Sequence, residues 1–441
     1  MPANALLLQG PVGPFFKRLA KQLEQQGLHV YKINLNGGDA FFYRGQAIAF
    51  RGPIAHWPQF FEQQLKTLAI DRLYLFGACR PYHAMARAIA KKRGVRVFVF
   101  DEGYLRPDCI TLEEVAPNGA SLVPQDPAFY RGFTAQEPVA LRAVGKTFGM
   151  MAWYASWYYF AGCLASWRYP HYQHHRPLNL LGEGYRWIRS GLRLVGYRVA
   201  EQRSLTQVTT DWSGRYFLVP LQVHCDAQVL HRSPFASVAQ FIETVVISFA
   251  HHAPNETALV IKHHPMDRGY RDYTKLIKTL ASHHHVTERV LYVHDLHLPT
   301  LLKHARGTVV INSTVGLSSL HHGTPVKALG EAPYDLPGLT CQSALEEFWG
   351  APGPVDRALY RRFRAYLLAT SQLNGNFYRR LAKIGNPMGV VWPSAIQVTA
   401  SRSASKRPPQ NRQPISSGFQ EAGYGSSVSE ATGYVVGKQI S

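Results

Sequence analysis

Apolar and polar positions alternate along this chain in blocks that predict strands and helices in turn. Residues 5–9 form a short apolar run, and residues 15–26 carry apolar side chains at helical spacing: Phe16, Leu19, Ala20 and Leu23. Gly27 ends this helix, and a second apolar run follows at residues 29–39. A strand, a helix and a strand in succession predict a doubly wound α/β domain.

The loop at residues 10–14 joins the first predicted strand to the first predicted helix. Its sequence, GPVGP, lacks the GxGxxG spacing of a dinucleotide site. Gly10 and Gly13 nevertheless allow a ligand to approach the backbone N–H groups closely. We therefore expect an acceptor or anion site here, formed by Gly10, Gly13 and His83.

Polar residues follow the next two apolar runs of the first half. Arg80 and His83 come after the first of them, and the run RVFVF ends on Asp101 and Glu102. Open α/β sheets bind ligands at the carboxyl ends of their strands, so we expect these side chains at one edge. Two carboxylates there suit acid/base or nucleophilic chemistry. The alternative is that Asp101 caps the next element and Glu102 is solvated.

A second α/β unit begins near residue 215. Its predicted strands are residues 216–226, 258–270, 289–295, 307–314 and 325–330. Their ends carry the candidate chemistry: Gln222, Asp226, Lys262, His264, Pro265, Ser313 and Thr314. Ser313 and Thr314 precede a helix, so they predict either an anion site or ordinary N-capping. The proline after His264 favours an extended backbone. This histidine either donates a hydrogen bond to a phosphate or belongs to a pair of surface histidines.

Two α/β units followed by a helical segment match the outline of a GT-B glycosyltransferase. We predict a Rossmann-like acceptor domain at residues 1–205 and a Rossmann-like donor domain at residues 206–350, facing each other across a cleft that holds the site. Residues 351–398 are expected to be helical and to cross back onto the first domain. Residues 399–441 are poor in core residues and rich in Ser, Gly, Pro and Gln, which predicts a disordered tail.

An uncharged, aromatic-rich segment occupies residues 148–167, between Lys146 and Arg168. Its length is close to the ~20 residues of a membrane span. Trp and Tyr favour the interface over the bilayer centre, so an interfacial helix that docks on a membrane fits better than a span. A buried core helix or a dimer contact is the alternative. The basic stretch that follows, including Arg186 and Arg198, suits phosphate head groups or is a solvated face.

Charge narrows the classes of partner. The 441 residues include 48 Lys and Arg against 28 Asp and Glu, a net charge of +20 that favours polyanions or anionic lipid surfaces. Zinc-finger, RNP and basic-helix patterns are missing, which argues against nucleic acid. Five scattered cysteines predict reduced thiols in the cytoplasm, and the first residues do not resemble a signal peptide. The histidine clusters lack ligand spacing, so we expect no metal.

Several motifs resemble those of known families. DEG at 101–103, HP at 264–265 and ST at 313–314 look like the motifs of bacterial sialyltransferase-like enzymes, which use CMP-sugars. Longer segments, from residue 5 to about residue 380, resemble the KpsS-type capsule polysaccharide biosynthesis family; they include FGACRPYH, FDEGYLRPD, VPLQVHCDAQ, KHHPMDRGY and INSTVGLSSLHHGTPVKALG. Ala78 departs from this pattern, because an acidic residue is expected there.

The resemblance implies a retaining β-Kdo transferase that takes Kdo from CMP-Kdo. It implies transfer to a phosphatidylglycerol-type lipid, which starts the poly-Kdo linker of capsular polysaccharide. The protein would be cytoplasmic and peripheral on the inner face of the cytoplasmic membrane. Its implied partners are the nucleotide-sugar donor, the anionic phospholipid and other capsule synthesis or export proteins, with no cofactor and no nucleic acid.

Roles for the residues follow from this chemistry. Glu102 is the candidate acid/base, with Asp101 as its alternative, and Asp226 is the candidate nucleophile. The donor-binding set is Arg80, Gln222, Lys262, His264, Pro265, Ser313 and Thr314, with Arg268 as a further cation for the Kdo carboxylate. Two other functions stay open: transfer of another CMP-sugar, such as sialic acid, and a non-catalytic lipid- or polysaccharide-binding role in capsule export.

Overall fold

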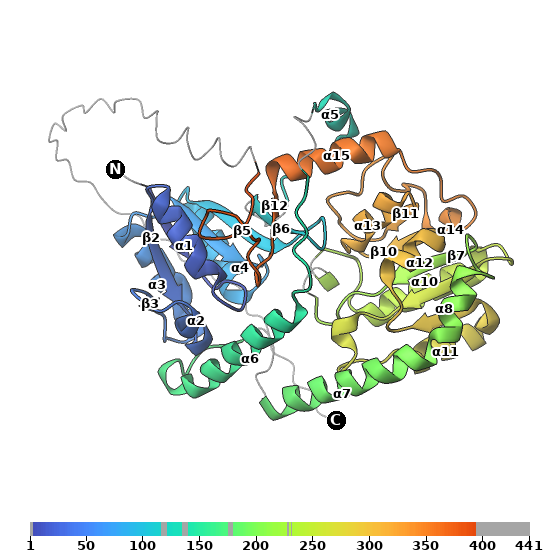
Figure 1. Cartoon of the computed structure of the whole chain (residues 1–441), viewed down its shortest axis with the longest axis horizontal. Helices are drawn as coiled ribbons and strands as arrows, with labels where there is room; N and C mark the ends of the chain where they lie inside the picture. The colour runs from blue at the N-terminus through green and yellow to red at the C-terminus, as the bar shows by residue number, and fades with distance from the viewer. Residues whose placement is uncertain are drawn as a thin grey trace, which may run out of the picture. The chain divides into compact units, whose positions relative to one another are not determined.

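The structure is a computed structural model, and it describes residues 3–115, 121–134, 140–174, 180–226, 229–230 and 232–393 (Figure 1). The predicted disordered tail from residue 399 lies outside the described residues. Two α/β units, each built on its own sheet, make up the described chain. This is the GT-B-like fold class that the sequence predicts.

The first sheet has seven strands within the described ranges, in the order β12-β6-β5-β4-β1-β2-β3. Its strands are β1 (Asn4–Leu7), β2 (His29–Asn34), β3 (Ile48–Ala49), β4 (Arg72–Phe76), β5 (Arg96–Glu102), β6 (Cys109–Glu114) and β12 (Gln372–Asn374). β1 to β5 are parallel, whereas β6 runs antiparallel to β5. The helices between them are α1 (Phe15–Gln25), α2 (Gly37–Phe42), α3 (Trp57–Thr67) and α4 (Pro81–Lys92).

The second sheet has five parallel strands in the part of the chain that is described, in the order β11-β10-β7-β8-β9. Its strands are β7 (Tyr216–Pro220), β8 (Ala258–Lys262), β9 (Val290–Val293), β10 (Ala305–Val310) and β11 (Val326–Ala328). Its helices are α10 (Val238–His252), α11 (Thr274–His283), α12 (Leu298–His304), α13 (Val315–His322) and α14 (Leu345–Phe348). The parallel strands of both units follow the same doubly wound order, in which the order of strands across the sheet reverses beside the first strand.

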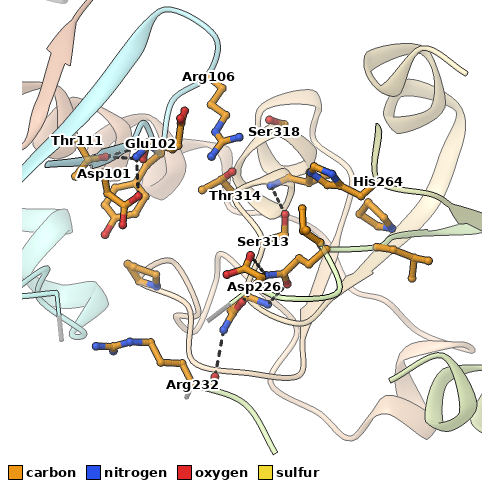
Figure 2. Close-up of a pocket in the computed structure, with 18 of the residues that line it drawn as sticks. Asp101, Glu102, Arg106, Thr111, Asp226, Arg232, His264, Ser313, Thr314 and Ser318 are labelled. Carbon is orange, nitrogen blue, oxygen red and sulfur yellow. Dashed lines mark hydrogen bonds between the residues drawn. The ribbon is translucent and has the colours of Figure 1, made fainter. Parts of the chain in front are cut away.

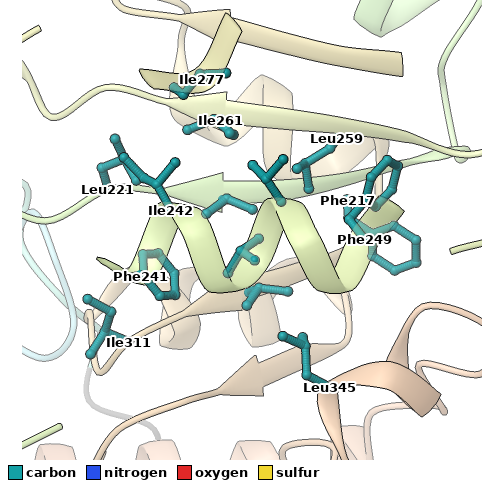
Figure 3. Packing of buried hydrophobic residues seen from close by; sticks show 14 of the residues in the cluster. Phe217, Leu221, Phe241, Ile242, Phe249, Leu259, Ile261, Ile277, Ile311 and Leu345 are labelled. Carbon is teal, nitrogen blue, oxygen red and sulfur yellow. The ribbon is translucent and has the colours of Figure 1, made fainter. Parts of the chain in front are cut away.

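The core of the second unit lies between its sheet and α10. Figure 3 shows Phe249 of α10 beside Phe217 of β7, Ile242 on the side of Ile261 of β8, and Phe241 beside Ile311. All six side chains are fully buried, and each contributes roughly 1.5–3 kcal/mol from the removal of apolar surface from water. This packing fixes α10 and the sheet as a rigid base for the loops at the strand ends.

The chain returns to the first sheet after completing the second. The segment predicted as helical contains α15 (Arg357–Thr370), but it then forms β12, which pairs antiparallel with β6. α15 also packs against α5 (Pro127–Gly132), where the ring centroids of Tyr130 and Phe363 lie 5.0 Å apart. The predicted crossing back is therefore present, and a strand that the helical prediction missed completes it.

Between β6 and β7 the described chain forms α5 and then three longer helices: α6 (Phe148–Leu164), α7 (Leu180–Ala200) and α8 (Gln202–Thr209). The predicted domain boundary at residues 205 and 206 falls inside α8. α6 packs on α2 through Tyr158 and Ala161 and exposes its other face, so the alternative of a buried core helix was wrong. No helix in the described ranges is long and apolar enough to cross a membrane. Short 3₁₀ turns occur at Ile54–His56, Ser166–Arg168, Pro265–Asp267 and Thr287–Arg289.

Candidate active site

A cavity of about 710 Å³ collects residues from the strand ends of both sheets. Ten of the predicted site residues line it: Arg80, Asp101, Glu102, Gln222, Asp226, Lys262, His264, Pro265, Ser313 and Thr314. In Figure 2 the pair Asp101 and Glu102 lies on one side, and His264 lies on the other. The volume is within the range of ~300–1,000 Å³ that is usual for small-molecule sites.

The two doubly wound sheets explain why these residues meet. In such sheets a crevice opens where strand order reverses, here between β1 and β4 and between β7 and β10. At the second of these points Gln222, after β7, donates from Nε2 to Asn312 Oδ1, after β10, at 3.0 Å. At the first, Arg80 Nη1 donates to Gln9 Oε1 at 2.9 Å. Hydrogen bonds therefore cross both crevices and fix the loops that line the cavity.

Asp101 and Glu102 are the last two residues of β5, where they pair with Thr111 and Ile110 of β6. Asp101 Oδ1 accepts the Glu102 N–H at 2.8 Å. Burial raises the pKa of Asp101 to about 6, although this hydrogen bond opposes the shift. Gly103 then turns the chain so tightly that an added Cβ would lie 1.9 Å from the Cys109 carbonyl oxygen. Only glycine fits this β5–β6 connection.

The loop after the carboxylates is held by the returning strand β12. Gln372 Oε1 accepts the N–H groups of Tyr104 at 2.9 Å and Leu105 at 3.3 Å. Gln372 Nε2 donates to Thr111 Oγ1 at 3.0 Å, and Asn374 Nδ2 donates to the Asp108 carbonyl oxygen at 2.7 Å. Gln372, about 270 positions downstream, thus holds the loop that follows the catalytic candidates, and the sequence interpretation did not identify it.

A further carboxylate, which we did not predict, lines the same cavity. Glu113 lies two residues after Thr111 on β6, so both face the cavity through the period-two alternation of a strand. Tyr104 Oη donates to Glu113 Oε2 at 3.2 Å. Burial raises the pKa of Glu113 to about 7. Recognising CITLEE as a strand antiparallel to β5 would have indicated this residue.

Asp226 lies on the second unit, in the loop that follows β7. Gln222 Nε2 donates to Asp226 Oδ2 at 3.2 Å, so the glutamine that bridges to Asn312 also orients this carboxylate. Figure 2 shows Asp226 at the same opening as Ser313 and apart from the Asp101 side. The cavity therefore has carboxylates on both units.

His264 and Lys262 both have a lowered pKa, whereas a simple cluster of cations would keep both side chains protonated. His264 is extended at φ −79°, as the following proline predicts, and its Nδ1 accepts the Met266 N–H at 3.2 Å. Burial, with Lys262 and Arg106 nearby, lowers the pKa of His264 to about 4. A neutral ring with Nδ1 as acceptor has its proton on Nε2, where it can be donated to a phosphate oxygen. Burial also lowers the pKa of Lys262 to about 8.

The two hydroxyls before α13 differ in what they bond. Ser313 Oγ accepts the Val315 N–H at 3.2 Å, which is the capping contact of the simpler prediction. Thr314 occupies the N-cap position, yet within the described residues its hydroxyl makes no capping hydrogen bond to the helix. Ser318, one turn further, also lines the cavity. The positive end of α13 and the Thr314 hydroxyl together favour an anion at this point.

The structure separates the predicted acceptor loop from this cavity. Gly10 and Gly13 line a different, much smaller cavity, and added Cβ atoms there would meet the rings of Phe16 and Tyr154 at 2.7 Å. Those glycines therefore make room for aromatic packing. His83 is fully buried, donates from Nδ1 to the Gly77 carbonyl oxygen at 2.9 Å, and has its pKa lowered by burial to about 3. Its placement under the loop contradicts a role as an anion ligand.

The structure also places Arg268, a predicted ligand of the Kdo carboxylate, and Ala78, the departure from the family pattern. Arg268 is buried and pairs with Asp295 at 2.6 Å, so it serves the second unit's own structure rather than the cavity. Ala78 does line the cavity, and its carbonyl oxygen accepts from Arg87 Nε at 3.0 Å. An acidic side chain at this position would therefore lie at the cavity edge.

Comparison with known proteins identifies the family. Residues 71–378 match the family model of the capsule polysaccharide biosynthesis protein. The capsule polysaccharide export protein KpsS of Escherichia coli is 40% identical over 374 residues, which cover 85% of this chain and 96% of that protein. The capsule polysaccharide modification protein LipB of Neisseria meningitidis serogroup B is 41% identical over 386 residues, covering 86% and 92%.

Among solved structures, the KpsC β-Kdo 2,7 transferase of Thermosulfurimonas dismutans aligns at 15% identity with a TM-score of 0.42, over 92% of this chain and 100% of that one. The assignment of family rests on the sequence matches, which extend over most of the chain and most of each relative. They confirm the family predicted from the motifs. The chain belongs to the capsule polysaccharide biosynthesis protein family.

Proposed function

We propose that this protein is a retaining glycosyltransferase that moves Kdo from CMP-Kdo to a phosphatidylglycerol-type lipid and so starts the poly-Kdo linker of a capsular polysaccharide. The observation that carries the proposal is the single cavity with carboxylates from both units and a phosphate-binding set on the second unit. Relatives named for capsule export and capsule modification support the pathway.

Departure of CMP is the first chemical step. Asp226 attacks the anomeric carbon of Kdo, the bond from that carbon to the phosphate oxygen breaks, and CMP leaves with the electron pair. Negative charge grows on the phosphate as it leaves. A neutral His264 that donates from Nε2, the Thr314 hydroxyl and the positive end of α13 stabilise that charge.

Transfer to the acceptor is the second step. Glu102 removes the proton of an acceptor hydroxyl, whose oxygen then attacks the anomeric carbon and releases Asp226 as a free carboxylate. Two displacements give net retention. Arg80, whose guanidinium lines the cavity and is oriented by Gln9, is suited to the sugar carboxylate of Kdo. Asp101, with its raised pKa, is the alternative proton acceptor.

The acceptor end of the proposal concerns the membrane. α6 exposes Trp153 and Phe160 on the face that turns away from α2, and the chain has a net charge of +20. Aromatic side chains and positive charge are typical of proteins that lie on an anionic membrane surface. We therefore propose a peripheral protein on the inner face of the cytoplasmic membrane, where it can meet both the nucleotide sugar and other capsule proteins.

A transfer assay tests the function directly. Purified protein is supplied with CMP-Kdo generated in situ and a fluorescent phosphatidylglycerol analogue, and the mass of the product is measured by mass spectrometry. A gain of one Kdo is expected, with a loss of roughly 10²–10⁴-fold in rate for Glu102→Gln. Glu114→Gln is the matched control, because Glu114 is half exposed and pairs with Arg96 outside the cavity.

The same preparation separates the other functions. Transfer from CMP-sialic acid but not from CMP-Kdo would replace the donor. Lipid binding without transfer from either donor would favour a non-catalytic component. Incubation with donor alone tests the mechanism, since a protein mass increased by one Kdo should form in Glu102→Gln and be missing in Asp226→Ala. Full activity of Asp226→Ala would remove that residue from the mechanism.

A further inference from the structure

The helix α7 presents an apolar stripe that its own fold leaves uncovered. Ile188, Leu192, Val195 and Val199 recur at intervals of three and four residues, and each is 64–74% exposed. This spacing places them on one side of the helix. Soluble proteins expose isolated apolar side chains, whereas a continuous stripe of this kind marks an interaction surface.

The opposite side of α7 is firmly attached to the second unit. Arg193 Nη1 donates to the Arg268 carbonyl oxygen at 2.9 Å, and the Tyr197 ring stacks on His294 with centroids 3.7 Å apart. The backbone of Arg186 lies against Gly269, where an added Cβ would be only 2.4 Å from its carbonyl oxygen. These contacts hold α7 on the loop that follows His264. The second unit therefore already packs against the other side of α7 and leaves the apolar stripe exposed.

The helix α6 has the same character on the first unit. Gly37 and Gly38 of α2 let it approach closely, since a Cβ on Gly37 would lie 2.4 Å from the Ala161 carbonyl oxygen. Its outer face carries Trp153 and Leu164, which are 58% and 69% exposed. In Figure 1 the two helices run along the same edge of the described chain, and the rings of Phe148 and Trp187 lie 6.3 Å apart. We call the exposed sides of both helices the α6–α7 face.

We infer that the α6–α7 face docks in the plane of an anionic phospholipid bilayer, and that α7 is the main basic anchor. Arg189 and Arg198 lie along α7 on the two flanks of the apolar stripe, whereas Arg193 is held by the second unit. This pairing of an apolar stripe with arginines is complementary to acyl chains beneath anionic head groups. A second copy of the chain would instead bring the same positive charges together.

The inference deepens the proposed function and depends on it only for the identity of the lipid. Each helix is attached to a different unit, so docking would hold both sides of the cavity at the membrane surface. α7 also touches the loop that carries His264.

Co-sedimentation of the full chain with vesicles tests the docking without any donor. Vesicles of phosphatidylcholine alone are compared with vesicles that also contain phosphatidylglycerol. Binding is expected only to the second kind, and Leu192→Glu or Trp153→Glu should weaken it by about tenfold or more, the effect of losing one buried apolar side chain. Ile247→Glu is the matched control, because Ile247 is 38% exposed on α10. High salt should weaken binding of the wild type.

Three results would overturn the inference. They are a wild type that does not sediment with phosphatidylglycerol vesicles, equal binding by Leu192→Glu and Ile247→Glu, and a dimer in solution that Leu192→Glu splits. A soluble short-chain phosphatidylglycerol separates docking from chemistry. Leu192→Glu should transfer Kdo to it at the wild-type rate while losing activity on vesicles. Vesicle binding without transfer to any acceptor would leave the docking surface intact and refute the proposed function.

Discussion

The strand β12 offers the sharpest test of how the cavity is held together. Replacing Gln372 by leucine keeps the side-chain size but removes the oxygen that accepts two N–H groups of the loop after Glu102. Tyr104 N–H keeps a partner, because Thr111 Oγ1 lies 3.3 Å from it. The N–H of Leu105 loses the acceptor that Gln372 supplies. An unpaired donor in a part-buried position costs about 1–2 kcal/mol.

The expected stability loss is modest, and the expected activity loss is not. For a domain of this size each kcal/mol corresponds to a fall of roughly 2–4 °C in melting temperature, which calorimetry can measure. Movement of a catalytic group by about 1 Å lowers the rate by roughly 10²-fold. We therefore expect Gln372→Leu to melt a few degrees lower and to transfer Kdo about 10²-fold more slowly.

Gln342→Leu is the matched control for this prediction. Gln342 Nε2 donates to Asp335 at 3.2 Å and to Thr340 Oγ1 at 2.8 Å, away from the cavity. The control should keep its transfer rate and lose less stability than Gln372→Leu, because Gln342 is exposed. If Gln372→Leu loses stability and keeps the wild-type rate, β12 does not position the loop and our account of the site geometry is refuted.

Three further predictions follow from single contacts. Because the pKa of Asp101 is raised in the folded protein, the carboxyl of the unfolded chain ionises first, and the folded state loses stability between about pH 4 and pH 6. Asp101→Asn should therefore melt at a higher temperature than the wild type above pH 6 and at the same temperature near pH 4. Thr314→Val should raise the KM for the donor with little change in melting temperature, whereas Ser313→Ala should cost about 1 kcal/mol of stability through its lost cap, as urea denaturation would show. Gly103→Ala should fail to yield folded protein by circular dichroism, because its Cβ would overlap the Cys109 carbonyl oxygen.

The positions of the main site residues could be predicted from sequence because they depend on local pattern. Each buried strand is marked by a short apolar run, and the ends of parallel strands meet at one edge whatever the details of packing. That reasoning placed Glu102, Asp226, His264 and Thr314 around one cavity. It failed for Gly10 and His83, which do not line that cavity, because residues at a strand end also pack against the core. Gly10 lies against the ring of Phe16, and His83 is fully buried.

What could not be predicted depends on contacts between distant segments. β12 has three residues, too few for a periodic pattern, and it exists because β6 offers it an unpaired edge. Glu113 lines the cavity only because β6 turns back against β5, which the apolar pattern alone does not reveal. α7 was interpreted through its arginines, and its apolar stripe can be recognised only once Arg193 and Tyr197 are known to contact the second unit.

The orientation of the reactive groups in this fold depends on contacts between segments that are distant in the chain. The carboxylates and hydroxyls that do the proposed chemistry are local features of strand ends. Gln372 and Gln222 hold them in register, and each of them bonds across a junction between segments that are far apart in the chain. Loss of either glutamine leaves every reactive group present and changes only its orientation. A family member could therefore keep all three motifs and still be inactive, and the glutamines at these two junctions are the residues to inspect first.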